Sequence, residues 1–158
     1  MEQADIADLK PAANRRMGST PLSRTKFMNR RVLICGDRNW NNYELVYNTL
    51  FRENVSSTKP PIECVIEGEA RGADSCGRKA AGFLGIPILA FPADWKEYGK
   101  AAGPIRNQQM IDEGKPTEVW AFHNDLKNSK GTKDMVLRSR KAGLPVWVHT
   151  EKETWFVY

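Results

Sequence analysis

From residue 32 onward, short apolar runs alternate with segments of helical character. The runs are continuous and rich in β-branched residues, as is typical of strands that are buried on both faces of a sheet. They cover residues 32–35, 62–66, 86–91, 119–122 and 146–148. Strands that alternate with helices pair in parallel and carry helices on both faces. The alternation therefore predicts an α/β fold.

The segments between the runs predict four helices. Apolar side chains recur every three or four residues from Tyr43 to Leu50, after Asn41 or Asn42 as a helix cap. The other helices are expected over residues 73–83, 104–112 and 132–141. Strands and helices in this order predict a Rossmann-like three-layer sandwich with a mainly parallel sheet of about five strands.

The charge distribution divides the chain of 158 residues into three parts. Residues 1–31 carry seven Lys or Arg against three Asp or Glu, which gives +4 of the total net charge of +5. We interpret residues 1–30 as a basic, disordered arm, and favour a solvated tail over a nucleic-acid-binding segment because aromatic residues are nearly absent from it. Residues 31–150 form the expected domain. Residues 151–158 form an apolar extension, which is either an extra edge strand or a subunit contact.

The cysteines, the histidines and the hydropathy pattern argue against a disulfide-bonded, metal-binding, membrane or secreted protein. The three cysteines lack CxxC spacing and the two histidines are far apart, so we expect no disulfide framework, metal site or cofactor. No apolar run reaches the length of a membrane span, and the first residues lack the hydrophobic region of a secretory signal. We therefore expect a cytoplasmic protein that does not contact a membrane.

The segment Glu67 to Asp74 reads Glu-Gly-Glu-Ala-Arg-Gly-Ala-Asp and lies between an apolar run and a helical segment. Its two glycines let the backbone bend and approach a ligand, while the helix start offers N–H groups and the positive end of its dipole. Arg71 can hold a phosphate with two hydrogen bonds. Two interpretations stay open at this point: an anion-binding loop, or a tight connection in which Asp74 caps the helix.

Polar, glycine-rich segments also follow the first, third and fourth runs. They cover residues 36–40, 92–95 with 103–107, and 128–134. Ligands of open parallel sheets bind at the carboxyl ends of the strands, so four such loops on one rim predict a ligand site. Neither GxGxxG nor a P-loop motif is present, which disfavours a standard dinucleotide site and a P-loop phosphotransferase.

Five ordered segments of the chain resemble the YpsA-related branch of the SLOG superfamily, which also includes the LOG phosphoribohydrolases and the DNA-processing protein A family. They are residues 32–40, 68–74, 91–95, 99–110 and 131–135. The resemblance covers about residues 31–148. It implies a Rossmann-like fold that binds a nucleotide or nucleotide-derived small molecule at glycine-rich loops, and a homo-oligomer.

Ligand-binding residues follow from the resemblance and from residue chemistry. The resemblance places Gly36 and Arg38 in the first loop and Gly68, Arg71, Gly72 and Asp74 in the second. Arg106 and Asn107 resemble the Arg-Lys pair of LOG proteins, while Ser129, Gly131 and Thr132 resemble their PGGxGT phosphate loop. Residue chemistry adds Asp37 and Asp94 as acceptors for ribose hydroxyls. It also adds Trp95, which could stack a base.

The aromatic and acidic residues of the rim have alternative roles. Trp40 and Trp95 either stack a base or pack against the rim, and packing is favoured. Asp74 and Asp134 lie near helix starts and are candidate dipole partners. Asp94 has no obvious capping role. Each of these aspartates could instead stabilise an oxocarbenium-like centre during cleavage of an N-glycosidic bond.

Three functions are compatible with these patterns. The leading hypothesis is a sensor or sequestering protein for a nucleotide-derived signalling ligand. The alternative is an N-glycosidic hydrolase of nucleoside monophosphates or ADP-ribose-like substrates, with Asp134 or Glu67 as the acidic catalytic residue. It ranks second because the PGG of the LOG loop is missing. A nucleic-acid-binding module ranks third, because the body outside residues 1–31 carries a net charge of only +1.

Overall fold

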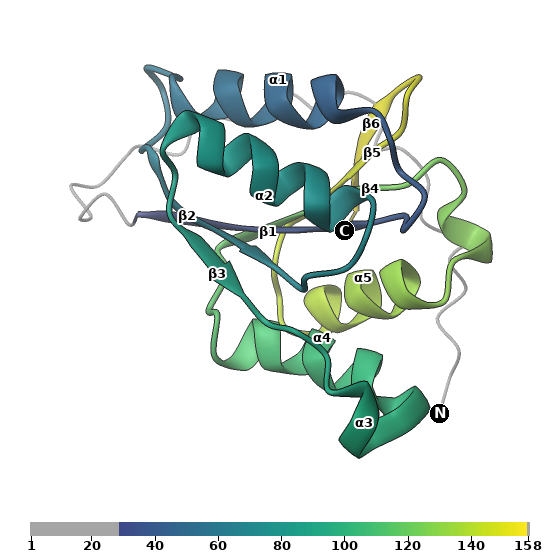
Figure 1. Cartoon of the computed structure of the whole chain (residues 1–158). Coiled ribbons are helices and arrows are strands. Elements are labelled where there is room, and N and C mark those ends of the chain that lie inside the picture. Colours follow the sequence, from purple (N-terminus) through teal and green to yellow (C-terminus); the bar gives the residue numbers. More distant parts are fainter. Residues whose placement is uncertain (1–28, 158) are drawn as a thin grey trace.

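A six-stranded sheet forms the centre of the computed structural model, which describes residues 29–157 (Figure 1). The strands are β1 (Arg30–Gly36), β2 (Ile62–Glu67), β3 (Ile88–Ala90), β4 (Glu118–Phe122), β5 (Val146–His149) and β6 (Thr154–Val157). Their order across the sheet is β3-β2-β1-β4-β5-β6. All neighbouring strands pair in parallel except β5 and β6, which are antiparallel. The mainly parallel α/β fold expected from the sequence is thus confirmed.

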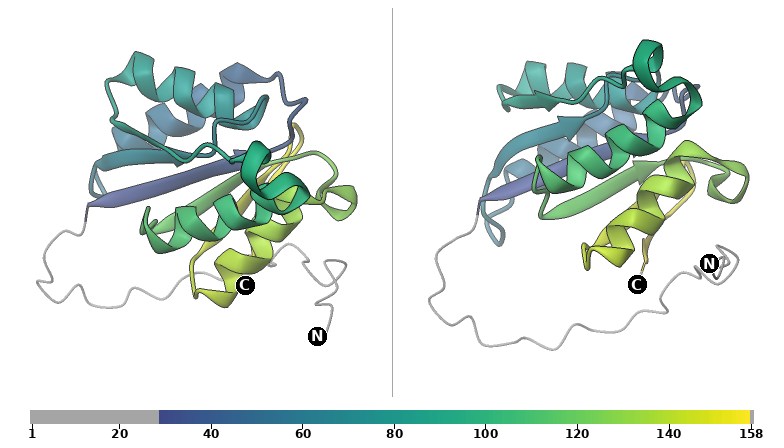
Figure 2. Two further views of the ribbon diagram at one scale, coloured as in Figure 1. Left: turned by 60° about the horizontal axis from the view of Figure 1, so that its bottom comes forward. Right: turned by 90° about the horizontal axis from the view of Figure 1, so that it is seen from below.

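Helices cover both faces of this sheet. They are α1 (Tyr43–Asn54), α2 (Ala73–Leu84), α3 (Trp95–Tyr98), α4 (Ala102–Asp112) and α5 (Gly131–Lys141), with short 3-10 turns at η2 (Gly99–Ala101) and η3 (Leu126–Asn128). α1 and α2 lie on one face, and α4 and α5 lie on the other (Figure 2). Asn42 caps α1, since its side chain accepts a hydrogen bond from the backbone N–H of Leu45 at 3.0 Å.

Two apolar clusters explain why the strand sequences are continuously hydrophobic. Leu33 of β1 points into the cluster shared with α4 and α5, next to Met110. Its neighbour Ile34 points into the cluster shared with α1 and α2, next to Leu50. Because successive side chains of a strand point to opposite faces, a sheet that is covered on both faces needs apolar residues at every position.

The structure differs from the expected elements at three places. The sheet has six strands rather than about five, because Thr154–Val157 of the C-terminal segment pairs with β5. This is the edge-strand alternative for that segment. β3 is shorter than the apolar run that predicted it, and α3 was not expected. α3 has four residues, too few to show a helical repeat in the sequence.

The basic arm lies outside the described residues except for its last two positions. Arg30 belongs to β1, where its side chain bonds Glu53 and Glu118. Within residues 29–157, no helix combines the length and the apolar character needed to cross a membrane.

Candidate functional site

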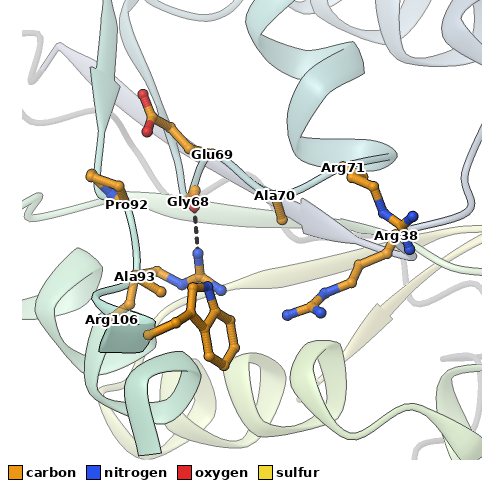
Figure 3. A pocket seen from close by; sticks show the side chains of 9 residues that line it. Arg38, Gly68, Glu69, Ala70, Arg71, Pro92, Ala93 and Arg106 are labelled. Atoms are coloured by element: carbon orange, nitrogen blue, oxygen red, sulfur yellow. Dashed lines mark hydrogen bonds between the residues drawn. The ribbon is translucent and has the colours of Figure 1, made fainter. Parts of the chain in front are cut away.

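A cavity of about 320 Å³ opens at the carboxyl ends of β1, β2 and β3 (Figure 3). We call it the arginine cavity, because three of its lining residues are arginines. The lining residues are Arg38, Gly68, Glu69, Ala70, Arg71, Pro92, Ala93, Trp95 and Arg106. They come from the loops after three parallel strands and from α3 and α4. The sheet therefore gathers at one rim residues that are up to 68 positions apart in sequence, from 38 to 106.

Arg38 and Trp95 meet across one side of the arginine cavity. The guanidinium carbon of Arg38 lies 5.4 Å from the centre of the Trp95 ring, within the range of a cation–π contact. Both side chains are exposed, and Trp95 keeps 49% of its surface accessible. A cation and an aromatic surface are thus presented together to an incoming ligand.

The backbone N–H groups of the second loop are bonded to carboxylates of the chain itself. Oδ2 of Asp74 accepts hydrogen bonds from the N–H of Gly68 at 2.9 Å and of Ala70 at 3.4 Å. Oε2 of Glu67 accepts one from the N–H of Glu69 at 2.6 Å. The sequence suggested that the N–H groups at the start of α2 would bind an anion, and there the N–H of Ala73 donates to the carbonyl of Asp37 at 3.0 Å. The three loop N–H groups hold internal carboxylates, which leaves the arginines as the groups best placed to bind an anion.

Both of these carboxylates are buried beneath the loop. Glu67 is fully buried, and burial raises its pKa. Among the described residues its Oε1 has no hydrogen-bond partner, and lies 3.8 Å from Nη1 of Arg78. Burial also raises the pKa of Asp74, against the opposing effect of the nearby Arg106 guanidinium. Glu67 and Asp74 therefore support the loop from below, while other residues line the cavity.

Arg106 reaches the cavity from α4 and fixes the second loop. Its Nη1 donates to the carbonyl oxygen of Gly68 (Figure 3). Its Nε donates to Oδ1 of Asn107 at 3.1 Å. A Cβ atom at Gly68 would lie 2.3 Å from Nη1 of Arg106. A glycine at position 68 is what lets the guanidinium approach so closely.

Asn107 and Asp134 connect α4 to α5 behind the arginine cavity. Nδ2 of Asn107 donates to Oδ2 of Asp134 at 3.0 Å and to the carbonyl of Gly131 at 3.3 Å. Nε of Arg138 donates to the same Oδ2 at 2.8 Å. Asp134, one of the two expected catalytic residues, is thus part of a helix–helix contact and does not line this cavity.

The fourth loop also contributes none of the residues that line the arginine cavity. The Oγ of Ser129 accepts a hydrogen bond from the N–H of Thr132 at 3.1 Å, at the start of α5, and Thr132 is buried. Gly131 begins α5. The roles expected for these three residues in phosphate binding stay predictions.

The first and second loops cross at Gly72, the N-cap residue of α2, which has a φ of 73°. The N–H of Ala73 donates to the carbonyl of Asp37 at 3.0 Å, and Oδ1 of Asp37 accepts from the N–H of Asn39 at 2.9 Å. Gly36 ends β1 opposite Phe122 of β4. In this arrangement Gly36, Asp37 and Gly72 set the positions of Arg38 and Arg71, and they do not line the cavity themselves.

The structure decides the roles of two side chains. Packing, the favoured interpretation of Trp40, is confirmed: the ring is buried, lies 5.8 Å from that of Phe122, and donates from Nε1 to the carbonyl of Asn42 at 3.0 Å. Asp94 does have a capping role, since its Oδ1 accepts from the N–H of Glu97 at 3.0 Å at the start of α3. The cap was missed because α3 is too short to be recognised from sequence.

We expect Asp94→Ala to lower the free energy of unfolding by about 1 kcal/mol, as is usual on loss of an N-cap. Asp94→Asn keeps an oxygen acceptor and should be close to wild type. Urea denaturation of the three proteins measures the difference. A role in ligand binding alone would leave all three equally stable, and would show instead as a change of ligand affinity in both variants.

Four lining residues were not selected from the sequence, namely Glu69, Ala70, Pro92 and Ala93. All lie in loops already chosen for their polar or glycine-rich character. The alanines and the proline carry no chemical group that marks a ligand site. The place of these small residues in the cavity wall follows only from the folded chain.

Comparison with known proteins matches part of this chain to a family model. A family model described as YAcAr, the YspA, cpYpsA-related SLOG family, matches residues 30–98. This segment contains every residue that lines the arginine cavity except Arg106. No solved structure matches the chain.

Two curated proteins are similar in sequence. The gene 61 protein of Mycobacterium phage D29 is 38% identical over 123 residues, which cover 74% of this chain and 94% of the phage protein. A putative GMP synthase (glutamine-hydrolyzing) of Halalkalibacterium halodurans is 32% identical over 105 residues, covering 52% of this chain. The match spans only 20% of that second protein.

Proposed function

Because the chain belongs to the YspA, cpYpsA-related SLOG family, we propose that it binds a nucleotide or a nucleotide-derived signalling ligand, as a sensor or sequestering protein. The observation that carries this proposal is the convergence of Arg38, Arg71 and Arg106 with the half-exposed Trp95 in one cavity. Its volume of about 320 Å³ lies in the range of small-molecule sites.

The charge of the arginine cavity favours an anionic ligand. Three guanidinium groups stand against one lining carboxylate, that of Glu69. Guanidinium groups match the geometry of phosphate with paired hydrogen bonds. A charged hydrogen bond contributes about 1.5 to 3 kcal/mol, and a micromolar ligand needs about 8 kcal/mol in total. Phosphate contacts to three arginines and stacking of a base on Trp95 would supply this without a metal ion.

An N-glycosidic hydrolase is the second candidate, and Glu67 is the observation that favours it. The carboxyl is fully buried and has a raised pKa, and its Oε1 has no hydrogen-bond partner among residues 29–157, with only the Arg78 guanidinium 3.8 Å away. Such a group next to the cavity-lining Gly68 has the character of a general acid. Binding without cleavage is favoured because neither Glu67 nor Asp134 lines the cavity. Incubation with AMP, GMP and ADP-ribose, followed by mass spectrometry, distinguishes the two. If wild type releases the base and Glu67→Gln or Asp134→Asn does not, the protein is a hydrolase and the proposal of binding alone is wrong.

Arg38→Ala and Arg71→Ala should each weaken nucleotide binding by about 10- to 100-fold, because each removes a charged hydrogen bond from an exposed position. GMP is the first probe, since the bacterial relative is named for that nucleotide. Calorimetric titration of the full chain measures the affinity. Lys141→Ala, at the exposed end of α5, is the control for loss of one positive charge.

Wild-type affinity in both arginine variants would refute binding in the arginine cavity. Equal weakening in the Lys141→Ala control would show a long-range effect of net charge rather than contact. The homo-oligomeric state and the cytoplasmic location stay predictions, as does the weaker alternative of nucleic-acid binding.

A further inference from the structure

A second cavity, of about 350 Å³, opens on the α1 face of the sheet, over β4, β5 and β6. We call it the tryptophan cavity, after Trp120 and Trp147 in its wall. α1 lies on this face of the sheet (Figure 1). The residues that line the tryptophan cavity and those that line the arginine cavity do not overlap.

His149 of β5 lines this cavity and carries a buried polar atom without a partner among the described residues. The residue is only 8% exposed and lines the cavity. Its Nδ1 lies 2.9 Å from Oγ1 of Thr154, whereas Nε2 has no hydrogen-bond partner within residues 29–157. Burial and the charge of Arg52 lower the pKa of His149 to about 4, so the ring is neutral at pH 7. A neutral imidazole nitrogen that is buried needs a partner to donate to it or accept from it.

Aromatic rings surround this imidazole. His149 stacks on Phe122 with ring centres 4.7 Å apart and planes 16° from parallel, and Trp120 meets it edge-on at 6.2 Å. Trp147 is only partly buried and tilts against Phe156 at 4.8 Å. Of these rings, those of Trp120, Trp147 and His149 line the cavity. A planar ring is a ligand shape that packs well against such a wall.

The ionic groups beside the cavity largely cancel. Glu118 accepts from Arg30 at 2.6 Å, and Glu53 accepts from Arg30 at 2.8 Å and from Lys59 at 2.7 Å. Arg52 also lines the cavity. With two carboxylates and three cations in this group, no strong field selects a multiply charged ligand. Carboxylates, cations and the imidazole together offer both acceptors and donors to the edge of a ring.

We propose that the tryptophan cavity is a second small-molecule site, which takes a neutral, planar nitrogen heterocycle of purine-base size against its aromatic wall with a hydrogen bond to Nε2 of His149. Ring size, mixed donor and acceptor edges, and lack of charge are shared by a free base and by the base of a nucleotide. The site is independent of the arginine cavity, so it stands whether or not that cavity binds a nucleotide.

Calorimetric titration of the full chain with adenine tests this proposal. Wild type should bind adenine saturably, and His149→Phe should weaken it at least about tenfold, because phenylalanine keeps the stacking on Phe122 but has no ring nitrogen. Arg71→Ala should bind adenine as wild type does. In that variant, tighter binding of adenine than of AMP indicates a free base, and the reverse indicates the base of a nucleotide.

A second measurement uses wild type alone and so does not depend on whether His149→Phe folds. In wild type, the ¹⁵N resonance of His149 Nε2 should shift on addition of adenine and stay unchanged on addition of ribose 5-phosphate, which has no heterocycle. The proposal is overturned if wild type shows no saturable adenine binding, if the Nε2 resonance does not respond, or if adenine binding is lost in Arg71→Ala and kept in His149→Phe.

Discussion

Gly72→Ala is expected to lower the free energy of unfolding by about 3 kcal/mol or more, because two penalties coincide at this position. Gly72 has a φ of 73°, a conformation that side chains with a Cβ disfavour. The added Cβ would also lie 2.1 Å from the carbonyl oxygen of Asp37 and 2.5 Å from the backbone carbon of Arg38. Both neighbours are backbone atoms, so relief requires movement of the whole first loop. Urea denaturation measures the loss.

Gly82→Ala provides the matched control, because it makes the same change inside α2, the helix that Gly72 precedes. An added Cβ at Gly82 would meet no atom within 4 Å, and its φ is not in the left-handed region. Replacing glycine by alanine inside a helix should raise the free energy of unfolding by about 0.5 to 1 kcal/mol. Similar stability of the two variants would show that the first loop yields easily and does not fix the site.

The crossing at Gly72 also positions the ligand-binding arginines. Arg38 follows the carbonyl that Gly72 contacts, and Arg71 directly precedes Gly72. Any shift that relieves the clash must therefore move at least one guanidinium of the arginine cavity. We expect Gly72→Ala to weaken nucleotide binding even where the protein remains folded, whereas Gly82→Ala should bind as wild type does.

The sheet could be predicted from sequence because its strands are buried on both faces. That burial requires apolar residues without interruption, as in the runs that became β1, β2, β4 and β5. β3 and α3 were less well defined, because three and four residues carry no periodic signal. The Thr154–Val157 strand was foreseen as one of two alternatives, since apolarity alone does not distinguish pairing within the chain from pairing with a second copy.

Three of the four loops that the sequence singled out line the arginine cavity, and the fourth does not. Strand ends identify a rim, and Arg38, Arg71 and Trp95 lie on it, while their contacts to a ligand stay predictions. Whether a side chain points outward depends on contacts between loops far apart in sequence. Trp40 folds under helix α1, and Asp74 turns inward to the N–H groups of Gly68 and Ala70. No local pattern distinguishes these buried residues from their exposed neighbours.

In the second loop, carboxylates bind the backbone N–H groups, so an anionic ligand would be held by arginine side chains. Internal carboxylates hold the loop shape by accepting from three of its N–H groups. Anion binding then depends largely on the exposed side chains of Arg38 and Arg71, whose interactions are screened by salt more than those of buried backbone donors. Nucleotide affinity should accordingly fall with increasing ionic strength.

Acidification from pH 7 to about pH 4 is expected to lower the free energy of unfolding by about 3 kcal/mol through His149 alone. Burial and the charge of Arg52 lower the pKa of this imidazole from 6.5 to about 4, while Glu53 opposes them weakly. Between these two values the unfolded chain binds the proton and the folded chain does not. The stabilising contribution of His149 is thus complete above pH 6.5 and is lost as the pH falls through this window.

His149→Phe isolates this effect from the carboxylates. Glu67 and Asp74 have raised pKa values, so they act with the opposite sign and bind protons first in the folded chain. They are present in both proteins, and their contributions cancel when the unfolding free energy of wild type is compared with that of the variant at each pH. As the pH falls below 6.5, the unfolding free energy of wild type should decrease relative to that of His149→Phe. A difference that stays constant down to pH 4 would mean that His149 is protonated in the folded chain, because water or Glu53 reaches its ring.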